Sequence, residues 1–458
     1  MEDMKNGKRS SFSGKLGYVL AAAGASVGLG NIWRFPYLAA KYGGGIFLII
    51  YIVLALTFGY TMIVAETAIG RMTRKSPVGA FKSFGKKKWL SFGGWINAVI
   101  PVLIVPYYSV IGGWVIKYLV EYFRGNAKLL AEDGYFTDFI SNGVSTELCF
   151  VAFCAFTLII IFAGVQNGIE RVSKIMMPIL IVLSVIIAVY SVTRPGALAG
   201  VKYFLVPNVK NFSWMTVVSA MGQMFYSLSI AMGILITFGS YMKKDTAIED
   251  STRNVEIFDT GIAIMAGLMI IPAVFAFSGG DPDTLQAGPS LMFITIPKVF
   301  QNMGFGTVIG IVFFLLVLFA AVTSSIALTE SAVSTFEDEL GWGRKKATVL
   351  VGVIMLVLGS LSSLGYGPLA GIKIIGMQFL DLFDFLTNSV MMPIAALLTS
   401  LLVSRVVGID KIEDEIIHGE SAFRRKKVFV VMIKYLCPVF AIIILLSSVA
   451  NALGWIKM

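Results

Sequence analysis

Long apolar segments alternate with short polar loops along most of the chain, and each segment is long enough to cross a lipid bilayer as a helix. The pattern predicts eleven membrane spans, and hence an all-α polytopic membrane protein. Their approximate ranges are 16–40, 46–70, 89–123, 149–165, a fifth that ends near 192, 214–241, 255–277, 305–336, 347–364, 372–403 and 428–455. Pro101 and Pro106 fall inside the third segment, and we expect them to interrupt it.

The basic residues gather in those loops that would lie on one side of the membrane. Such loops stay cytoplasmic, which places the N-terminus in the cytoplasm and, after eleven spans, the C-terminus outside. The net charge of +10 is therefore explained by topology, and no nucleic-acid partner is expected. Composition agrees with a protein of the cell membrane, because 57% of the residues are hydrophobic, 14% are charged and the mean hydropathy is +0.83. Three cysteines and one histidine form no pattern typical of disulfides or of a metal cluster.

Glycine and polar residues interrupt the first span. Gly24, Gly28 and Gly30 each weaken a helix by about 1 kcal/mol relative to alanine. Backbone groups freed at such a break are tolerated at membrane depth only where they line a cavity buried in protein. Asn31 and Arg34 agree with this interpretation, since charged side chains inside a membrane usually face an interior pathway. The stretch therefore predicts a binding site.

Close helix packing and nucleotide binding are the competing interpretations of this stretch. Small residues four apart, such as Gly24 and Gly28, can simply allow two helices to pack closely. Residues 28–33 also partly match a dinucleotide-binding fingerprint, but no strand precedes them and Trp33 stands in place of the third glycine. Dinucleotide binding is therefore excluded. No other stretch resembles a nucleotide-binding loop, so ATP is not expected to drive the protein.

The sixth predicted span is interrupted in the same manner, by Gly222, Ser227, Ser229 and Gly233. The two interrupted spans are five apart, and an odd repeat length gives the two five-helix units opposite orientations. Paired breaks in inverted repeats are typical of secondary transporters with a site near the midplane of the membrane. We therefore predict a 5+5 inverted repeat with broken helices 1 and 6. The predicted division is a tail at 1–15, repeats at 16–192 and 214–403 joined by an outer loop at 193–213, an inner loop at 404–427 and an eleventh helix at 428–458.

Several motifs resemble those of the neurotransmitter:sodium symporters, the family of bacterial amino-acid transporters and of monoamine and GABA transporters. They are Gly-Leu-Gly-Asn-Ile-Trp-Arg-Phe-Pro-Tyr at 28–37, Gly-Gln-Met-Phe-Tyr-Ser-Leu-Ser at 222–229, Thr-Ser-Ser at 323–325 and Phe-Glu-Asp-Glu at 336–339. The resemblance covers nearly the whole chain, and eleven spans resemble the bacterial, leucine-transporter-like branch.

The resemblance implies a symporter, not an enzyme, that imports hydrophobic or aromatic L-amino acids with sodium by alternating access. The implied partners are an amino acid, two sodium ions and the lipid bilayer, while the oligomeric state stays open. A sodium-dependent amino-acid sensor or a substrate-gated channel on the same fold is the alternative.

The resemblance also implies which residues hold the substrate and the ions. The substrate carboxylate would meet the amides of Leu29 and Gly30, and Gly28 stands where monoamine transporters carry an aspartate. The implied substrate site comprises Ser26, Leu29, Gly30, Ile104, Tyr108, Tyr226, Ser227, Ser229, Met232, Ser324 and Leu328. The implied first sodium site comprises Ser26, Asn31, Ser227 and Asp259, and the second comprises Gly24, Val27, Ala320, Thr323 and Ser324. Sodium prefers such oxygen ligands, although polar side chains on the eighth span could instead link helices.

Two ion pairs are implied as gates. Arg34 and Asp384 would close the outer side, and Arg9 and Asp338 would close the inner side. Phe12 stands where the family carries a tryptophan, and Arg9 could instead be only a charge that sets the topology.

Chloride is not expected to be required. In chloride-dependent relatives an anion lies beside the first sodium, contacted by residues that match Tyr51, Gln223 and Ser227 and by a seventh-span serine, in whose place this chain has Ala263. Asp259, one turn earlier, would supply the balancing negative charge. The alternative is that Asp259 faces cytoplasmic water near the start of the seventh span.

Overall fold

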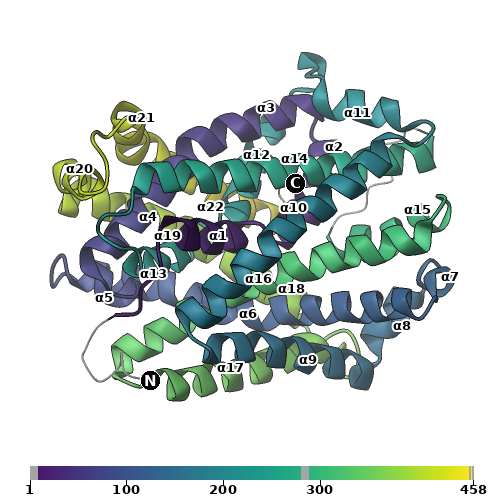
Figure 1. Cartoon of the computed structure of the whole chain (residues 1–458), viewed down its shortest axis with the longest axis horizontal. Coiled ribbons are helices and arrows are strands. Elements are labelled where there is room, and N and C mark those ends of the chain that lie inside the picture. The colour runs from purple at the N-terminus through teal and green to yellow at the C-terminus, as the bar shows by residue number, and fades with distance from the viewer. Residues whose placement is uncertain (1–8, 280–287, 453–454, 456–458) are drawn as a thin grey trace.

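A computed structural model describes residues 9–279, 288–452 and 455. The regular structure of these residues is helical, apart from two isolated β-bridges that pair Gly44 with Pro207 and Ile374 with Met377. The long helices lie side by side along the long axis of the molecule, and short helices gather at its two ends (Figure 1). We name these ends inner and outer after the predicted topology, the inner end being the one that carries the N-terminal segment.

Nine helices in the described residues are long and apolar enough to cross a membrane, or ten if one bent pair of helices counts as a span. The bent pair is α1 (Lys15–Ser26) with η2 (Gly30–Arg34) and α2 (Phe35–Lys41). The other spans are α3, η3 and α4 (Gly45–Leu54, Ala55–Gly59, Tyr60–Thr73), α6 (Lys88–Phe123), α9 (Gly143–Phe162), η4 and α10 (Val165–Glu170, Arg171–Val192), α14 (Ile248–Ser278), α16 (Gly306–Leu340), α17 (Arg344–Leu364), α18, η8, α19 and η9 (Phe379–Asp384, Phe385–Met391, Met392–Leu401, Leu402–Val407), and α21, η10 and α22 (Lys426–Val431, Met432–Leu436, Cys437–Ala452). The sixth predicted span consists of two short helices, α12 (Trp214–Ser227) and α13 (Ile234–Ser240).

The remaining helices connect the spans at the two ends (Figure 1). The inner end carries α5 (Pro77–Lys82) and α20 (Ile409–Ile417). The outer end carries α7 (Ala127–Leu130), α8 (Tyr135–Ser141), α11 (Ala197–Leu205), η5 (Val209–Asn211), η7 (Leu291–Thr295) and α15 (Ile296–Gln301).

The first span is broken where the glycines predict it. α1 ends at Ser26, the chain resumes as helix at Gly30, and the two halves are bent by 53°. Gly24 lies before the break and serves packing, because a Cβ at this position would be 3.1 Å from Thr323 Cβ on α16. α1 packs against α10, α14 and α16. Both interpretations of this stretch therefore hold, at different positions. Gly24 allows close packing, and the helix break lies between Ser26 and Gly30.

The sixth span is broken over residues 228–233, between α12 and α13. Ser229 and Ala231 have φ values of 52° and 58°, a left-handed conformation that is unfavourable for residues with a side chain. Glu66 of α4 is fully buried and accepts the N–H of Ala231 at 2.7 Å. The break is thus maintained by contacts with a neighbouring span, since a short chain segment does not hold such a conformation by itself.

The expectation that Pro101 and Pro106 interrupt the third span is wrong. α6 runs unbroken from Lys88 to Phe123 and contains both prolines. Neighbouring helices compensate for the hydrogen bonds that proline removes from a membrane helix, and α6 packs against α5, α9, α16 and α17.

Candidate functional site

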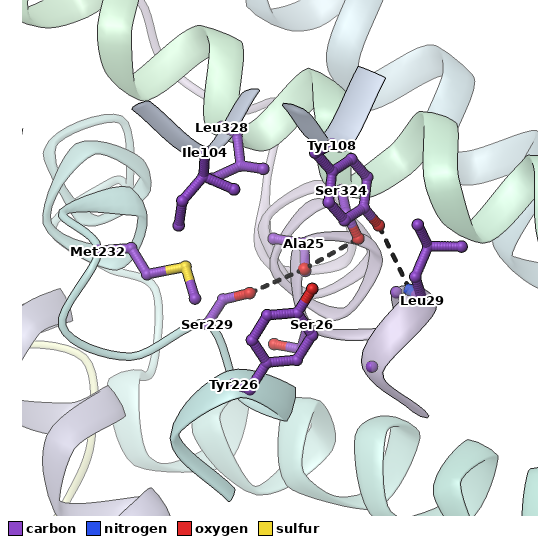
Figure 2. Close-up of a pocket in the computed structure, with 12 residues that line it drawn as sticks. Ala25, Ser26, Leu29, Ile104, Tyr108, Tyr226, Ser229, Met232, Ser324 and Leu328 are labelled. Carbon is purple, nitrogen blue, oxygen red and sulfur yellow. Dashed lines mark hydrogen bonds between the residues drawn. The ribbon is translucent and has the colours of Figure 1, made fainter. Parts of the chain in front are cut away.

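A pocket lies between the two breaks, near the middle of the helix bundle. Its walls come from the break in the first span, the break in the sixth span, α6 and α16 (Figure 2). It is lined by Ala25, Ser26, Gly28, Leu29, Gly30, Ile104, Tyr108, Tyr226, Ser229, Met232, Ser324 and Leu328. All predicted substrate-site residues are among them except Ser227, which lies in the neighbouring cluster around Asp259.

Backbone donors and acceptors face this pocket from opposite halves of the broken span. Beyond the break, the amide of Leu29 donates to the hydroxyl of Tyr108 at 3.3 Å. Before the break, the carbonyl of Ala25 accepts the hydroxyl of Ser229 at 2.8 Å (Figure 2). The amides of a helix N-terminus attract negative charge, and the carbonyls of a helix C-terminus attract positive charge. The pocket therefore presents complementary ends to a zwitterion.

Sequence reasoning missed Ala25 as a pocket residue. Its side chain has no chemistry of its own, but its carbonyl also accepts the hydroxyl of Ser324 at 3.2 Å. The signal was available, because Ala25 immediately precedes the break and a helix that ends there leaves its last carbonyls without partners.

The remaining wall of the pocket is apolar. Ile104, Met232 and Leu328 face the same space from three different elements (Figure 2). The cavity that remains between the lining side chains is narrow, with a volume of about 30 Å³. Tyr226 contributes to this narrowness, since a Cβ on Gly30 would be 2.3 Å from its ring. A bound amino acid requires these side chains to move apart, which the flexible Met232 does readily.

Gly28 leaves space that no other residue would leave. A Cβ at this position would lie 2.7 Å from Ser324 Oγ and 3.1 Å from Tyr108 Oη. The first of these distances is too short for ordinary contact, so a side chain here would displace groups that line the pocket. Position 28 therefore offers no carboxylate to the pocket, unlike the aspartate that the resemblance implies for monoamine transporters.

Asp259 joins the broken first span to α12 and α3. Its carboxylate accepts Asn31 Nδ2 at 2.8 Å, Tyr51 Oη at 2.9 Å and Ser227 Oγ at 2.9 Å. The alternative in which Asp259 faces water is wrong, because the residue is 0% exposed and lies about three turns inside α14. Three of the four predicted ligands of the first sodium, Asn31, Ser227 and Asp259, thus form one buried cluster.

The fourth predicted ligand of the first sodium, Ser26, lies close by in the pocket wall and donates its hydroxyl to the Leu228 carbonyl at 3.3 Å. Asn31 Oδ1 accepts the amide of Gly28 at 3.2 Å, so that the nitrogen of its side chain faces Asp259.

The residues of the second predicted sodium site also come together, between α1 and α16. Ser324 Oγ lies 3.2 Å from the Gly24 carbonyl and 3.4 Å from the Val27 carbonyl. Thr323 Oγ1 lies 3.2 Å from the Ala320 carbonyl. Ser324 thus joins α16 to the carbonyls at the end of α1, and Thr323 and Ala320 are paired on the same helix. Carbonyl and hydroxyl oxygens are the kind of ligand that a sodium ion prefers.

The predicted inner gate is formed. Arg9 makes an ion pair with Asp338, and it also donates to Ser240 at 3.0 Å and to Ser334 at 2.9 Å. Burial by itself lowers the pKa of the Arg9 guanidinium. The nearby Tyr241 and Asp338 raise this pKa by a larger amount, so the net pKa is above its ordinary value. Arg9 is therefore a charged part of a network and not a free surface charge.

Phe12 completes this inner closure. Its side chain is 1% exposed, and its ring lies 5.6 Å from that of Phe238 and 6.1 Å from that of Tyr241. Phe12 therefore fills the position at which the family that this chain resembles carries a tryptophan.

The predicted outer gate is open. Arg34 and Asp384 line one cavity of about 520 Å³, but within the described residues they form no ion pair. The guanidinium of Arg34 lies 5.3 Å from the ring centre of Tyr226. Asp384 instead accepts Asn388 Nδ2 at 2.6 Å and Tyr107 Oη at 3.2 Å. The ion pair of the predicted inner gate is thus formed, whereas a cavity separates the two residues of the predicted outer gate.

Comparisons with known proteins agree with this arrangement. The profile of the "Sodium:neurotransmitter symporter family" matches residues 9–130 and 137–455. The uncharacterized sodium-dependent transporter YhdH of Bacillus subtilis is 34% identical over 450 residues, which are 97% of this chain and 99% of the relative. An uncharacterized sodium-dependent transporter of Methanocaldococcus jannaschii is 31% identical over 428 residues, or 89% of this chain and 84% of the relative.

Among solved structures, the crystal structure of MhsT in complex with L-phenylalanine is similar, with a TM-score of 0.86 and 34% identity over 96% of this chain and 100% of that chain. These matches confirm the predicted helical membrane fold and show a sodium-dependent transporter, not an enzyme. The chain belongs to the sodium:neurotransmitter symporter family.

Proposed function

We propose that this sodium-dependent transporter imports L-amino acids with large apolar or aromatic side chains, together with two sodium ions and without chloride. The observation that carries the proposal is the pocket between the two breaks, with amides at one end, carbonyls at the other and an apolar wall. The similar MhsT structure is a complex with L-phenylalanine, an amino acid of this class.

The polar ends of the pocket suit the head group of an amino acid. The substrate carboxylate binds the amides of Leu29 and Gly30, assisted by the hydroxyl of Tyr108. The ammonium group binds the carbonyls that end α1 and the hydroxyl of Ser229. A monoamine has no carboxylate for the amides, and Gly28 supplies no acid for its amine, so monoamines are poor substrates.

The side-chain end of the pocket determines which amino acids bind. Ile104, Met232 and Leu328 offer no hydrogen bond and no charge. Burying the charge of glutamate or lysine against this wall costs far more than it gains. Glycine loses the apolar contact, which is worth about 1.5–3 kcal/mol for a large aliphatic or aromatic side chain.

Both sodium ions are cargo that the two oxygen clusters carry with the substrate. Ser26, Asn31, Ser227 and Asp259 hold the first, with the substrate carboxylate as a further ligand. Gly24, Val27, Ala320, Thr323 and Ser324 hold the second. The first ion touches the substrate, so binding of each strengthens binding of the other.

The carboxylate of Asp259 takes the place of chloride. Tyr51 and Ser227, which match residues that contact the anion in chloride-dependent relatives, are hydrogen-bonded to Asp259. Ala263, one turn later on the same helix, is fully buried and has no hydroxyl for an anion. A cation in such a buried site needs a nearby negative charge, and Asp259 supplies it from the protein itself.

Transport follows from alternating exposure of the pocket. In this structure the Arg9–Asp338 pair closes the inner end while a cavity leads in from the outer end. Two sodium ions that cross inward gain about 2.3 kcal/mol each per 100 mV of membrane potential. Together they provide roughly 4.6 kcal/mol, enough for an accumulation of more than about a thousandfold.

Counterflow into proteoliposomes tests which amino acids are carried. Vesicles loaded with unlabelled L-phenylalanine should take up labelled L-phenylalanine in sodium but not in choline. Leucine, methionine, phenylalanine and tryptophan should compete, whereas glycine, glutamate and lysine should not. Strong competition by glutamate or lysine, with none by the apolar amino acids, would overturn the proposed substrate class.

A further inference from the structure

The helix of the inner loop, α20, has a buried face that carries a carboxylate. Ile412 and Ile416 are fully buried, and Glu415, next to Ile416, is only 5% exposed. Glu415 forms an ion pair with Arg71 at the inner end of α4, with 2.7 Å between Oε1 and Nε, and Arg71 is 0% exposed. Two charges that lie 344 positions apart in the chain are therefore joined by an ion pair whose side chains are 0% and 6% exposed.

Arg71 connects three segments of the chain. Beyond the carboxylate, it donates to the carbonyl of Glu415 on α20 and to that of Thr246 in the connection between α13 and α14. Lys244 of the same connection lies 2.8 and 2.7 Å from the two carboxylate oxygens of Glu415. The approach is close, because a Cβ on Gly419 would be 2.7 Å from the Thr246 carbonyl.

A second attachment lies a few residues further along, at the starts of α14 and α21. The carboxylate of Glu249, in the first turn of α14, accepts the amides of Arg424 and Arg425 at 2.8 and 2.9 Å, just before α21 begins. The carboxylate of Glu420 accepts the amide of Glu249 in return. Glu420 thus caps the start of α14 from the other segment, while Glu249 holds the backbone that leads into α21. Tyr60 of α4 adds a hydrogen bond to Glu249 at 2.9 Å.

We propose that residues 409–425, named here the inner strap, bind the inner ends of α4, α13 and α14 into one unit that moves as a body during transport. The proposal rests on the alternating access proposed above. Figure 1 shows α20 and α21 at the inner end, beside the ends of α14 and α4. Both attachments use carboxylates that are at most 5% exposed, Glu415 and Glu249, so they persist while surface charges exchange partners with water.

The strap matters because α13 is only seven residues long. It lies directly on α4, since a Cβ on Gly70 would be 2.0 Å from the Ile236 carbonyl and one on Gly239 would be 2.5 Å from the Thr67 carbonyl. The strap fixes the connection that follows α13, and so keeps α13 on α4 when the inner gate opens. Without the strap, α13 moves away from α16 without α4 and α14. The inner end then opens while the outer cavity is still open.

Two reporter cysteines distinguish these motions, in a full-length protein whose Cys149, Cys154 and Cys437 are replaced by alanine. Thr237→Cys reports the inner end, because Thr237 is buried on α13 with its hydroxyl 3.3 Å from Ser331 of α16. Ser389→Cys reports the outer end, because Ser389 lines the outer cavity. Maleimide labelling rates are measured in proteoliposomes with sodium, and with sodium plus L-phenylalanine.

Without strap mutations, we expect the two labelling rates to change in opposite directions when the amino acid is added. With Glu415→Gln, Thr237→Cys should label about 2- to 30-fold faster in sodium, while Ser389→Cys stays within about twofold of its original rate. Lys244→Gln leaves no unpaired buried charge and should give a smaller change of the same kind. Glu413→Gln is the matched control, because Glu413 lies on the same helix but pairs with Lys426 at the surface, with exposures of 28% and 43%.

Three results contradict the strap. The first is that the labelling rate of neither reporter changes in Glu415→Gln or Lys244→Gln. The second is that the two rates change by equal and opposite factors. The third is that Glu413→Gln has the same effect as Glu415→Gln. Equal and opposite changes would mean that the unit stays intact and that only the equilibrium between its inward-open and outward-open positions shifts. If the two rates do not respond in opposite directions even without strap mutations, alternating access itself fails, which separates that result from failure of the strap. Thermal unfolding of each variant in detergent verifies that it is folded.

Discussion

Asn31 and Asp259 lie in contact, with 2.8 Å between Nδ2 and Oδ1, and so join the break in the first span to α14 across 228 positions of sequence. The contact places a carboxylate beside backbone that a membrane helix would normally keep paired. In our account this is where sodium and substrate meet. The carboxylate attracts the cation, and the break provides the free amides that the substrate carboxylate needs.

Removing a ligand oxygen from either sodium cluster should weaken the sodium dependence of binding. Asn31→Ala removes a ligand of the first site and Thr323→Ala a ligand of the second. We expect each to raise the sodium concentration needed for half-maximal phenylalanine binding by about 10- to 100-fold, the range for a lost contact with a charged group. Scintillation proximity binding at varied sodium measures this shift. Thr329→Ala is the control, since Thr329 is buried on the same helix and its hydroxyl bonds the Ser325 carbonyl; unchanged sodium dependence in both site variants would refute the site assignment.

A side chain at position 28 should impair the pocket. Gly28→Ala places a Cβ 2.7 Å from Ser324 Oγ, so the wall must shift or the substrate must bind less deeply. Overpacking of this kind costs about 1–3 kcal/mol, and we expect affinity for L-phenylalanine to fall by about 5- to 100-fold. Gly261→Ala, on α14 where a Cβ would meet nothing within 4 Å, is the matched glycine control. Equal affinities of the two variants would show that Gly28 does not face the substrate.

Amino acid and sodium together should close the outer cavity by drawing Arg34 toward Asp384. Labelling of Ser389→Cys by an impermeant reagent should then fall by about fivefold, equivalent to about 1 kcal/mol. Asp384→Asn should remove this protection. Asp381→Asn should retain it, because Asp381 lines the same cavity but accepts the hydroxyl of Tyr366 at 3.2 Å. If both variants keep the protection, the Arg34–Asp384 pair is not the outer gate.

Chloride independence should depend on Asp259. The original chain should transport at the same rate when gluconate replaces chloride. Asp259→Asn should transport poorly in either anion, because the sodium charge is then unbalanced. Adding Ala263→Ser should restore part of the activity in chloride only, since the new hydroxyl completes an anion site with Tyr51 and Ser227. An absolute chloride requirement of the original chain would end this explanation.

Local sequence signals were sufficient to predict both breaks and a binding site beside them, whereas most of the pocket residues were implied by the resemblance to a family. Gly28 and Gly30 weaken the helix, and polar residues such as Asn31 at membrane depth usually face an interior pathway, so their positions within one apolar span predicted where a site lies. The sequence also predicted that Arg9 and Asp338 meet, through the resemblance to a family.

Features that depend on distant contacts or on conformation escaped sequence reasoning. Pro101 and Pro106 do not break α6, which packs against α5, α9, α16 and α17. Such packing inside a membrane protein is the condition under which helices tolerate proline. The open state of Arg34 and Asp384 reflects which end of the molecule is closed, and no sequence pattern encodes that. The pairing of Arg71 with Glu415 had no local signal either, since each residue by itself resembles an ordinary charge of a cytoplasmic loop.

The most direct test of the account is accumulation of L-phenylalanine in proteoliposomes that contain the purified full-length chain. An inward sodium gradient with an inside-negative potential is applied, and internal and external concentrations are compared at steady state. We expect concentrative uptake that collapses when the sodium gradient is removed and that persists without chloride. Uptake that stops at equal concentrations would indicate a channel, and sodium-dependent binding without accumulation would indicate a sensor; either result would contradict sodium-coupled import of apolar amino acids through this site.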